Sequence, residues 1–423
     1  MGDWVLDFEA ELNNLRNAQS QEEQRRKKRS IHRLPPLIIS DLDKKVYEPE
    51  MVSFGPYHYG EPRLKPMEDH KHRALLYFLD RTRVSLDTIF NSMVGVEQDL
   101  KDSYDSLQPE WQNDTKKFVK LMIVDGCFTL EILRAKTQKP RRDYSDDNPI
   151  FGPHGELYAM PFIKRDMLLL ENQLPMLVLY MLKSFEENIE GNTETLNDLI
   201  LAFCGQGGRI ADMGKCLHIL DLYRRSLLYK IPKANSIPPA QHMWDTIARS
   251  ATELAEAGIR FKRSESNSLL DITFEHGVLS LPQLVVDAST ESIFLNLIAF
   301  ERCHVVVGNY LCSYIWFMSN IVQQDPDISL LRSKGIIFNF AGSDKAVDDL
   351  FNTVSKDLMM DPSSDLYMVF ESTAFYCAKR WHKLRATLIH NYPWTGVSIV
   401  AGVILFVLTT LQTVFTIFDV LRK

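Results

Sequence analysis

The chain has 423 residues, of which 45% are hydrophobic and 24% are charged. These fractions are typical of a globular protein with a buried core and exclude a disordered, collagen-like or disulfide-stapled chain. The formal net charge of −7 argues against a nucleic-acid-binding protein, since such proteins usually carry a basic face. Six cysteines without a C-x-x-C pair predict free, mostly buried thiols in a reducing compartment, with one or two disulfides as the alternative.

Residues 1–30 form a separate N-terminal segment. Trp4, Phe8, Leu12 and Leu15 are spaced as on one face of a helix, which predicts a short amphipathic helix. The run from Arg25 to Arg29 is entirely basic and fits an anionic lipid patch, a nuclear signal or a solvated linker. The segment lacks the basic start and long apolar run of a secretory signal.

Helical periodicity dominates residues 31–230, which form the first half of the main domain. Apolar residues recur at three- and four-residue steps over 71–90 and 118–133, which predicts a helix in each range. A further helix is predicted over 166–182, with Pro175 in an early turn and with Asp166 and Glu171 near the positive end of the helix dipole.

A proline-rich linker, residues 231–242, precedes the second half of the domain, residues 243–392. Within it, two apolar runs near 269–287 flank Gly277 and predict a β-hairpin. Helices are predicted again over 292–322 and 344–358. The expected fold is therefore mainly α, with one large helical domain, a small β-hairpin element and one C-terminal transmembrane helix.

Residues 393–420 are the expected membrane anchor. From Val397 to Phe418 the side chains are almost all apolar, and about 22 residues at 1.5 Å rise give roughly 33 Å, enough to cross a hydrocarbon core of about 30 Å. Four basic residues between 379 and 385 precede the span and two follow it, so the positive-inside rule places the large domain in the cytosol. The opposite topology stays open, and Asn113 is a glycosylation sequon that would report it. The length suits the plasma membrane or the endoplasmic reticulum.

No catalytic, cofactor-binding or metal-binding motif assembles along the chain. The alternative hypothesis of a membrane-tethered enzyme depends on Cys127 as a thiol nucleophile or on Asp166 and Glu171 as an acid/base pair. The apolar neighbours of Cys127 indicate instead a buried packing cysteine. We therefore expect a protein that is not an enzyme, needs no cofactor, and contacts membrane lipid through its C-terminal helix.

Several segments in a fixed order carry a resemblance to a known family. They are Gly55-Pro56-Tyr57-His58, Asp125-Gly126-Cys127-Phe128, the stretch from Asp166 through Glu171-Asn172-Gln173 to Pro175, Asn296 to Glu301, and Tyr392-Pro393-Trp394. Together they resemble the plant family called domain of unknown function 247, whose members are also named UPF-type uncharacterised proteins. The similarity runs from about Ile31 to the C-terminus. The chain departs from the family pattern at Phe54 and Arg302.

The resemblance implies a mostly helical plant protein with one C-terminal membrane span, and it assigns no active residue. Some members of the family are tied to reproductive recognition, including self-incompatibility in grasses, and others to sex determination or stress responses. We therefore expect a recognition or signalling protein that works by binding protein partners of unknown identity. The polar loops over 141–147 and 186–195 are the expected contact surfaces, since exposed loops tolerate variation.

Overall fold

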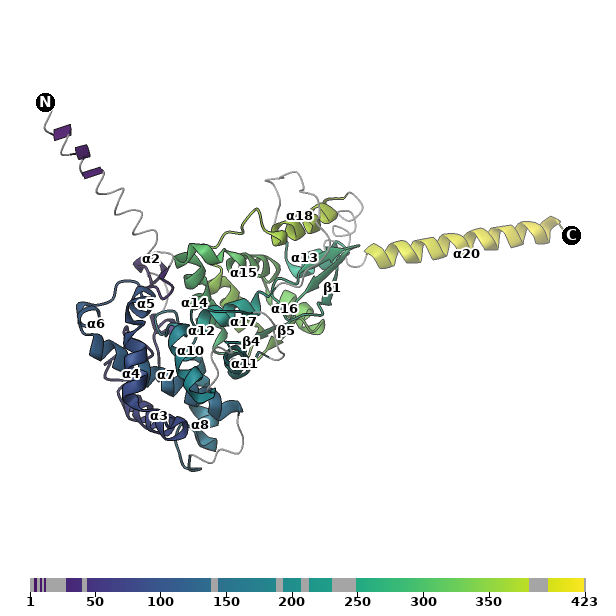
Figure 1. Ribbon diagram of the computed structural model, residues 1–423. Helices are drawn as coiled ribbons and strands as arrows, with labels where there is room; N and C mark the ends of the chain where they lie inside the picture. Colours follow the sequence, from purple (N-terminus) through teal and green to yellow (C-terminus); the bar gives the residue numbers. More distant parts are fainter. Residues whose placement is uncertain are drawn as a thin grey trace. The chain divides into compact units, whose positions relative to one another are not determined.

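The fold is mainly helical (Figure 1), as predicted, with small sheets and one long apolar helix at the C-terminus. The computed structural model describes residues 4–5, 8–9, 11–12, 28–39, 44–137, 144–187, 193–206, 213–229, 249–379 and 395–421. The expected linker 231–242 and the motif Tyr392-Pro393-Trp394 lie outside these ranges, as do parts of both polar loops.

The chain divides into two compact units. Unit 1 comprises Met1–Tyr229 and Ala288–Cys312, and unit 2 comprises Lys230–Asp287 and Ser313–Lys423. The six cysteines all carry free thiols, as predicted, and all but Cys303 are buried.

Unit 1 is built around one long buried helix, α7. Its described helices are α2 (Pro36–Ile39), η1 (Lys44–Val46), α3 (Pro66–Thr82), α4 (Leu86–Val94), α5 (Glu97–Asp102), α6 (Pro109–Asn113), α7 (Thr115–Thr137), α8 (Pro153–Tyr158), α9 (Met160–Asp166), α10 (Met176–Glu187), α11 (Thr193–Phe203), α12 (Ile219–Leu227), α14 (Thr290–Cys303) and η2 (Val305–Val307). Helices α3, α4, α6, α10 and α11 all pack on α7. This follows from the α7 sequence, which is apolar around nearly its whole circumference between Phe118 and Ala135.

The helix predicted over 71–90 is two helices, α3 and α4. Arg83 takes a left-handed conformation with φ of 59° and ends α3. Ser85 then begins α4, because its hydroxyl accepts a hydrogen bond from the backbone N–H of Thr88. The helix predicted over 118–133 is confirmed as α7.

The prediction of one helix over 166–182 is wrong in its first half. Asp166 is the last residue of α9, residues 167–175 form turns, and α10 begins at Met176. Asp166 therefore lies at the C-terminal end of a helix and Glu171 lies in the turn, so neither is a helix-start residue. The helix predicted over 292–322 is likewise divided into α14 and α15, with Gly308 at a φ of 78° between them.

Unit 2 contains the predicted hairpin. Strands β2 (Thr273–Glu275) and β3 (Val278–Leu281) pair antiparallel around His276 and Gly277. Both turn residues have positive φ, at 50° and 77°, which is the geometry of a two-residue hairpin turn.

Two short strands of unit 2 lie outside this prediction, and the second predicted apolar run is divided into two strands by a break at residues 282–283. Strand β1 (Arg260–Arg263) pairs parallel to β3 and completes a three-stranded sheet of order β1-β3-β2. Strands β4 (Leu284–Val286) and β5 (Ile337–Asn339) form a separate parallel pair. The helices of this unit are α13 (Ala251–Glu256), most of α15 (Tyr310–Ile321), α16 (Asp325–Ser333), α17 (Asp344–Val354), α18 (Asp365–Ala378) and α20 (Thr395–Leu421).

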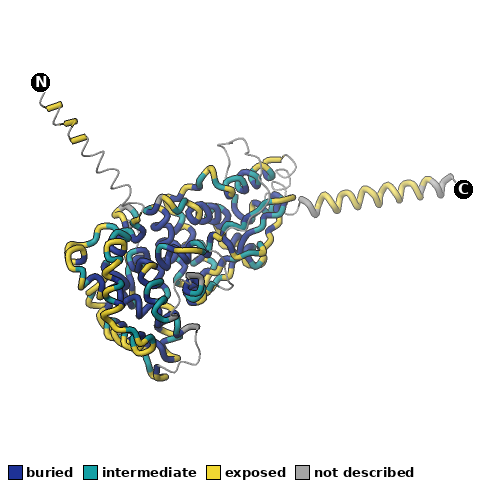
Figure 2. Tube along the Cα trace, viewed as in Figure 1, coloured by how far each residue is buried: buried dark blue, intermediate teal, exposed yellow. Residues whose placement is uncertain are grey.

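Helix α20 contains both predicted ends of the membrane anchor, Val397 and Phe418. Its stretch Ser398–Phe415 is long and apolar enough to cross a membrane, and none of that stretch is buried against the rest of the chain. Figure 2 shows this exposure along the described length of the helix.

Candidate functional site

The carboxylate of Asp166 holds the irregular segment before α3. Its oxygens accept hydrogen bonds from three successive backbone N–H groups, those of Glu50 (2.9 and 3.1 Å), Met51 (2.7 Å) and Val52 (2.9 Å). Arg165 supports it from the adjacent position with a contact of 3.1 Å. Burial raises the pKa of Asp166, while the three N–H donors act in the opposite direction. The carboxylate orders this loop through the three backbone N–H groups that donate to it.

Asn172 and Gln173 replace helical hydrogen bonds in the turn after α9. The Asn172 amide accepts from Phe54 N at 2.7 Å and donates to Val52 O at 3.0 Å. Gln173 donates to two backbone carbonyls of the turn at 2.7 Å each and accepts from Leu220 N at 3.1 Å. These bonds explain why residues 167–175 form turns and do not continue helix α9. Leu174 and Pro175 follow in a buried position directly before α10.

Asp125 forms a fully buried ion pair with Lys71. The Lys71 ammonium lies 2.8 Å from Asp125 Oδ1, and both side chains have no exposed surface. Asp125 Oδ2 accepts from Gly55 N at 2.8 Å, and Lys71 donates to Ser53 O at 2.6 Å. Burial raises the pKa of Asp125 to about 6, and the Lys71 charge opposes this shift. The pair joins α3 and α7 to the same segment that Asp166 holds.

Two glycines of the family segments allow close approaches of the backbone. Gly55 has a φ of +73°, and a Cβ there would lie 2.8 Å from Gln173 O. A Cβ on Gly126 would lie 2.5 Å from a methyl group of Leu182, so this glycine lets α7 and α10 touch. The buried Pro56 follows Gly55 directly.

Cys127 and Phe128 belong to the core. Both side chains have no exposed surface, and the Phe128 ring stacks on Phe54 at 6.2 Å between centroids. Burial raises the pKa of the Cys127 thiol well above its usual value. A thiolate nucleophile needs a lowered pKa and access to solvent, so the environment of Cys127 favours a packing role.

Glu171 holds residues 30–34, which we call the N-terminal strap, against the rest of unit 1. It accepts from Leu34 N at 2.6 Å and from the Arg33 guanidinium at 3.0 Å. Arg33 lies over the Tyr57 ring at 3.9 Å, and Tyr57 donates to the carbonyls of Ile31 and Asp105. His58 Nδ1 is 2.6 Å from Glu61, and its Nε2 is 3.9 Å from Glu171.

Three histidines lie where this strap packs against the rest of unit 1, and one of them, His32, belongs to the strap itself. His218 Nε2 lies 3.1 Å from Ser30 O, and His32 Nε2 lies 3.4 Å from His304 Nδ1. The Phe300 ring packs against both His218 and His304. Burial lowers the pKa of His32 and of His218 to about 4 and also lowers that of His304. All three are therefore neutral at physiological pH.

The structure thus brings all the predicted family residues from Gly55 to Pro175 together in unit 1. Their polar atoms bind backbone groups and side chains of neighbouring elements, such as Lys71 and Arg33. Among the described residues, no group of three or more His, Cys, Asp or Glu side chains is arranged to hold a metal ion.

Lys71 and the three histidines were not among the predicted site residues. The sequence pattern does indicate that Lys71 is buried, because Lys71 shares one face of α3 with Met67, Ala74 and Phe78. A lysine inside an apolar stripe indicates a buried partner of opposite charge. The histidines come from three distant segments and have no local signal.

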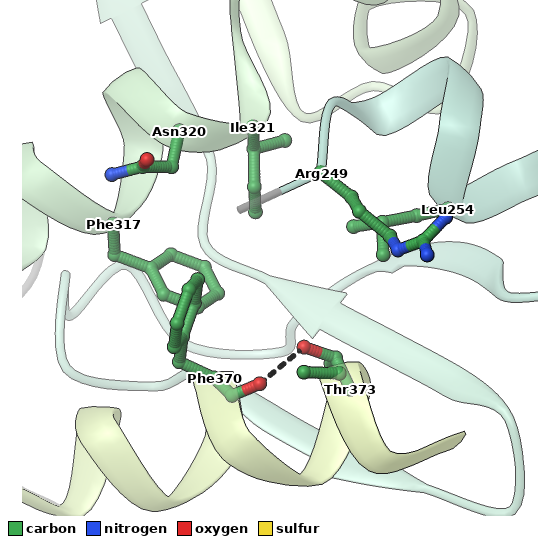
Figure 3. Close-up of a pocket in the computed structure, with 8 residues that line it drawn as sticks. Arg249, Leu254, Phe317, Asn320, Ile321, Phe370 and Thr373 are labelled. Carbon is green, nitrogen blue, oxygen red and sulfur yellow. Dashed lines mark hydrogen bonds between the residues drawn. The ribbon is translucent and has the colours of Figure 1, made fainter. Parts of the chain in front are cut away.

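Unit 2 contains a small pocket between aromatic and aliphatic walls (Figure 3). Phe317 and Phe370 form one side, and Arg249 and Leu254 form the other. The Thr373 hydroxyl lies at its edge and donates to Phe370 O at 2.7 Å. The residues that line the pocket are mostly apolar and include no carboxylate.

We expect Asp166→Asn to lower the free energy of unfolding by about 3 kcal/mol, because a neutral amide replaces a buried carboxylate that accepts from three backbone N–H groups. Chemical denaturation of the detergent-solubilised chain would measure the change. The matched variant Asp147→Asn alters an exposed carboxylate and should shift stability by less than about 0.5 kcal/mol. Equal, small effects of the two changes would show that the Asp166 hydrogen bonds contribute little.

We expect acid to destabilise unit 1 through its buried histidines. His218 has a folded-state pKa of about 4, below the unfolded value of 6.5, so its contribution is present above pH 6.5 and is lost as the pH falls toward 4. The loss amounts to about 3 kcal/mol for this group. Denaturation series from pH 7 to 4 should show a shallower slope for His218→Gln than for wild type. The same slope in His218→Gln and in the exposed control His72→Gln would contradict the assignment.

Comparison with known proteins agrees with the segments gathered in unit 1. Residues 31–408 match DUF247, described as a plant protein of unknown function. The chain is similar to the UPF0481 protein At3g47200 of Arabidopsis thaliana, with 31% identity over 93% of this chain and 87% of that protein. It is also similar to the putative UPF0481 protein At3g02645 of the same plant, with 22% identity over 92% of this chain and 90% of that protein. No solved structure shows significant similarity. The chain therefore belongs to the DUF247 family of plant proteins of unknown function.

Proposed function

We propose that this protein is a single-pass membrane protein that binds protein partners without catalysing a reaction. Helix α20 is the observation that supports the membrane anchor. Its stretch Ser398–Phe415 contains no charged residue and is not buried against the rest of the chain. Exposure of so many apolar side chains to water is unfavourable by about 25 cal/mol for each Å². A bilayer of about 30 Å removes that cost.

The flanking charges support a cytosolic location for both units. Lys379, Arg380, Lys383 and Arg385 precede α20, whereas Arg422 and Lys423 follow it. Basic residues concentrate on the cytosolic side of membrane helices. Free thiols at all six cysteines suit the same reducing compartment.

A cluster of exposed apolar and aromatic side chains on unit 1 supports the binding of protein partners. The exposed residues of α8 and α9 from 153 to 162 are Pro153, His154, Leu157, Tyr158, Pro161 and Phe162, and we call them the α8–α9 face. Leu157, Tyr158 and Phe162 are 70%, 64% and 46% exposed. Aromatic residues are enriched and charged residues depleted at the centres of protein interfaces. The α8–α9 face has this composition.

The groups that suggested catalysis are engaged in other contacts, which supports a role other than catalysis. Asp166 and Glu171 accept hydrogen bonds from backbone N–H groups, and Cys127 is buried with a raised pKa. Reproductive recognition and stress response stay predictions that rest on the family resemblance.

We expect both units to be accessible from the cytosol. In sealed plant microsomes, protease should digest the tagged N-terminal part, and the exposed Asn113 should carry no glycan. Protection of the units together with a glycosidase-sensitive shift at Asn113 would reverse the topology. Extraction of the full chain by carbonate would refute the membrane anchor itself.

We expect the α8–α9 face to bind the partner. Leu157→Ser with Phe162→Ser should weaken capture of reproducible partners from native membranes by at least about tenfold, because two apolar contacts at an interface are lost. The control Leu76→Ser with Leu86→Ser alters side chains of unit 1 that are 61% and 49% exposed and should leave capture unchanged. Wild-type protein that captures no reproducible partner would contradict the proposed function.

A further inference from the structure

The edge strand β1 of unit 2 carries a cluster of exposed cations. Within its four residues, Arg260, Lys262 and Arg263 are exposed and Phe261 is buried. Arg260 pairs in register with Val278 and Lys262 with Ser280, so the two cations project from the same face of the sheet. Glu275 lies on this face at the opposite edge, on β2. The positive charge is therefore concentrated at one edge.

Within the part of the chain that the structure describes, the backbone of β1 also presents groups without a strand partner at this edge. The N–H groups of Arg260 and Ser264 donate to Gly277 and Leu281. Because hydrogen-bonding direction alternates along a strand, the N–H groups of Phe261 and Arg263 point away from β3. Lysine and arginine on an edge strand can serve merely to prevent pairing with other strands. The cations of β1 alone therefore do not assign a ligand.

The connection from α18 to α20 ties this sheet to the proposed membrane anchor. Helix α18 packs on the same sheet, where Tyr376 contacts Phe274 at 5.5 Å between ring centroids. Helix α18 ends at Ala378 and α20 begins at Thr395, so 16 residues separate them. At about 3.5 Å per residue the connection spans at most about 55 Å.

The end of α18 also has a composition suited to a lipid headgroup layer. Phe375 is 65% exposed, and the Lys379 ammonium lies 5.7 Å from the centre of its ring. The connection itself adds Arg380, Lys383 and Arg385. Aromatic and basic side chains both favour the interface between a bilayer and water.

We propose that the β1 edge docks on anionic phospholipid headgroups of the leaflet from which α20 enters the membrane. This inference rests on the proposed membrane anchor. Arginine binds phosphate through two parallel hydrogen bonds, and each basic residue near an anionic surface strengthens binding about fivefold. Three cations alone give weak binding. The connection to α20 compensates, because it keeps the sheet at high local concentration beside the bilayer.

The test measures hydrogen exchange at the amides of Phe261 and Arg263. The full chain is reconstituted in nanodiscs of phosphatidylcholine alone and of phosphatidylcholine with phosphatidylserine. We expect exchange to slow by about tenfold or more in the anionic discs. The slowing should disappear at about 1 M salt, where the Debye length is about 3 Å.

A matched pair of variants separates the β1 edge from net charge. Arg260→Gln with Lys262→Gln should abolish the slowing, whereas Lys334→Gln with Lys345→Gln removes two exposed cations elsewhere in unit 2 and should retain it. Slow exchange at Arg260 and Ser264, whose amides are paired with β3, verifies that the sheet stays folded in each variant.

Equal exchange in the two lipid compositions would overturn the docking, as would slowing that persists in the Arg260/Lys262 variant or is lost equally in the control. Slowing that requires an added protein extract would assign the edge to an acidic protein and would also overturn it. A wild-type chain that does not co-purify with the discs would instead refute the membrane anchor and, with it, the docking. Incorporation of the chain into the discs without slower exchange at Phe261 and Arg263 would refute the docking but not the membrane anchor.

Discussion

The structure of unit 1 depends on side chains that satisfy the backbone of a buried irregular segment, residues 47–58. Only the N–H groups of Tyr47 and Glu48 donate to the adjacent helical turn η1, and the rest of the segment has no helical or sheet partners. A buried N–H without an acceptor costs about 1–3 kcal/mol. Asp166 accepts three of these groups, Asn172 accepts one and Asp125 accepts another. The same residues bind α3, α7 and the end of α9, so one set of hydrogen bonds fixes both the loop and the helices around it.

This constraint explains why the family segments look chemically reactive. A loop buried in an apolar core needs strong acceptors, and carboxylates that receive several N–H donors are the strongest available. An acid such as Asp166, a buried lysine such as Lys71 and an amide such as Asn172 are also the groups from which catalytic sites are built. In this chain Asp166 and Asn172 bind mainly backbone groups, and Lys71 is paired with Asp125 and Glu68.

Local signals predicted part of the fold and nonlocal contacts decided the rest. The continuous apolar pattern from 118 to 133 predicted α7, and Gly277 marked the hairpin turn, because both depend on neighbours in sequence. The helix over 166–182 failed because Asn172 and Gln173 bond the backbone of the turn in place of helical bonds. Strands β1 and β5 had no local signal, because each pairs with a parallel strand that is distant in the sequence. The family residues were identified from sequence, whereas their convergence on residues 47–58 required the structure.

The surface offers two chemistries that suit different partners. The α8–α9 face of unit 1 has aromatic and apolar side chains and no charge, whereas the β1 edge of unit 2 has three cations in four residues. An anionic lipid surface gains electrostatic energy from the second but not from the first, and the reverse holds for the desolvated centre of a protein interface. Substitutions at exposed positions usually change stability by less than about 0.5 kcal/mol, while loss of a buried charged acceptor costs several times more. Because the reactive-looking residues lie in the interior, either surface can change its chemistry without loss of the fold.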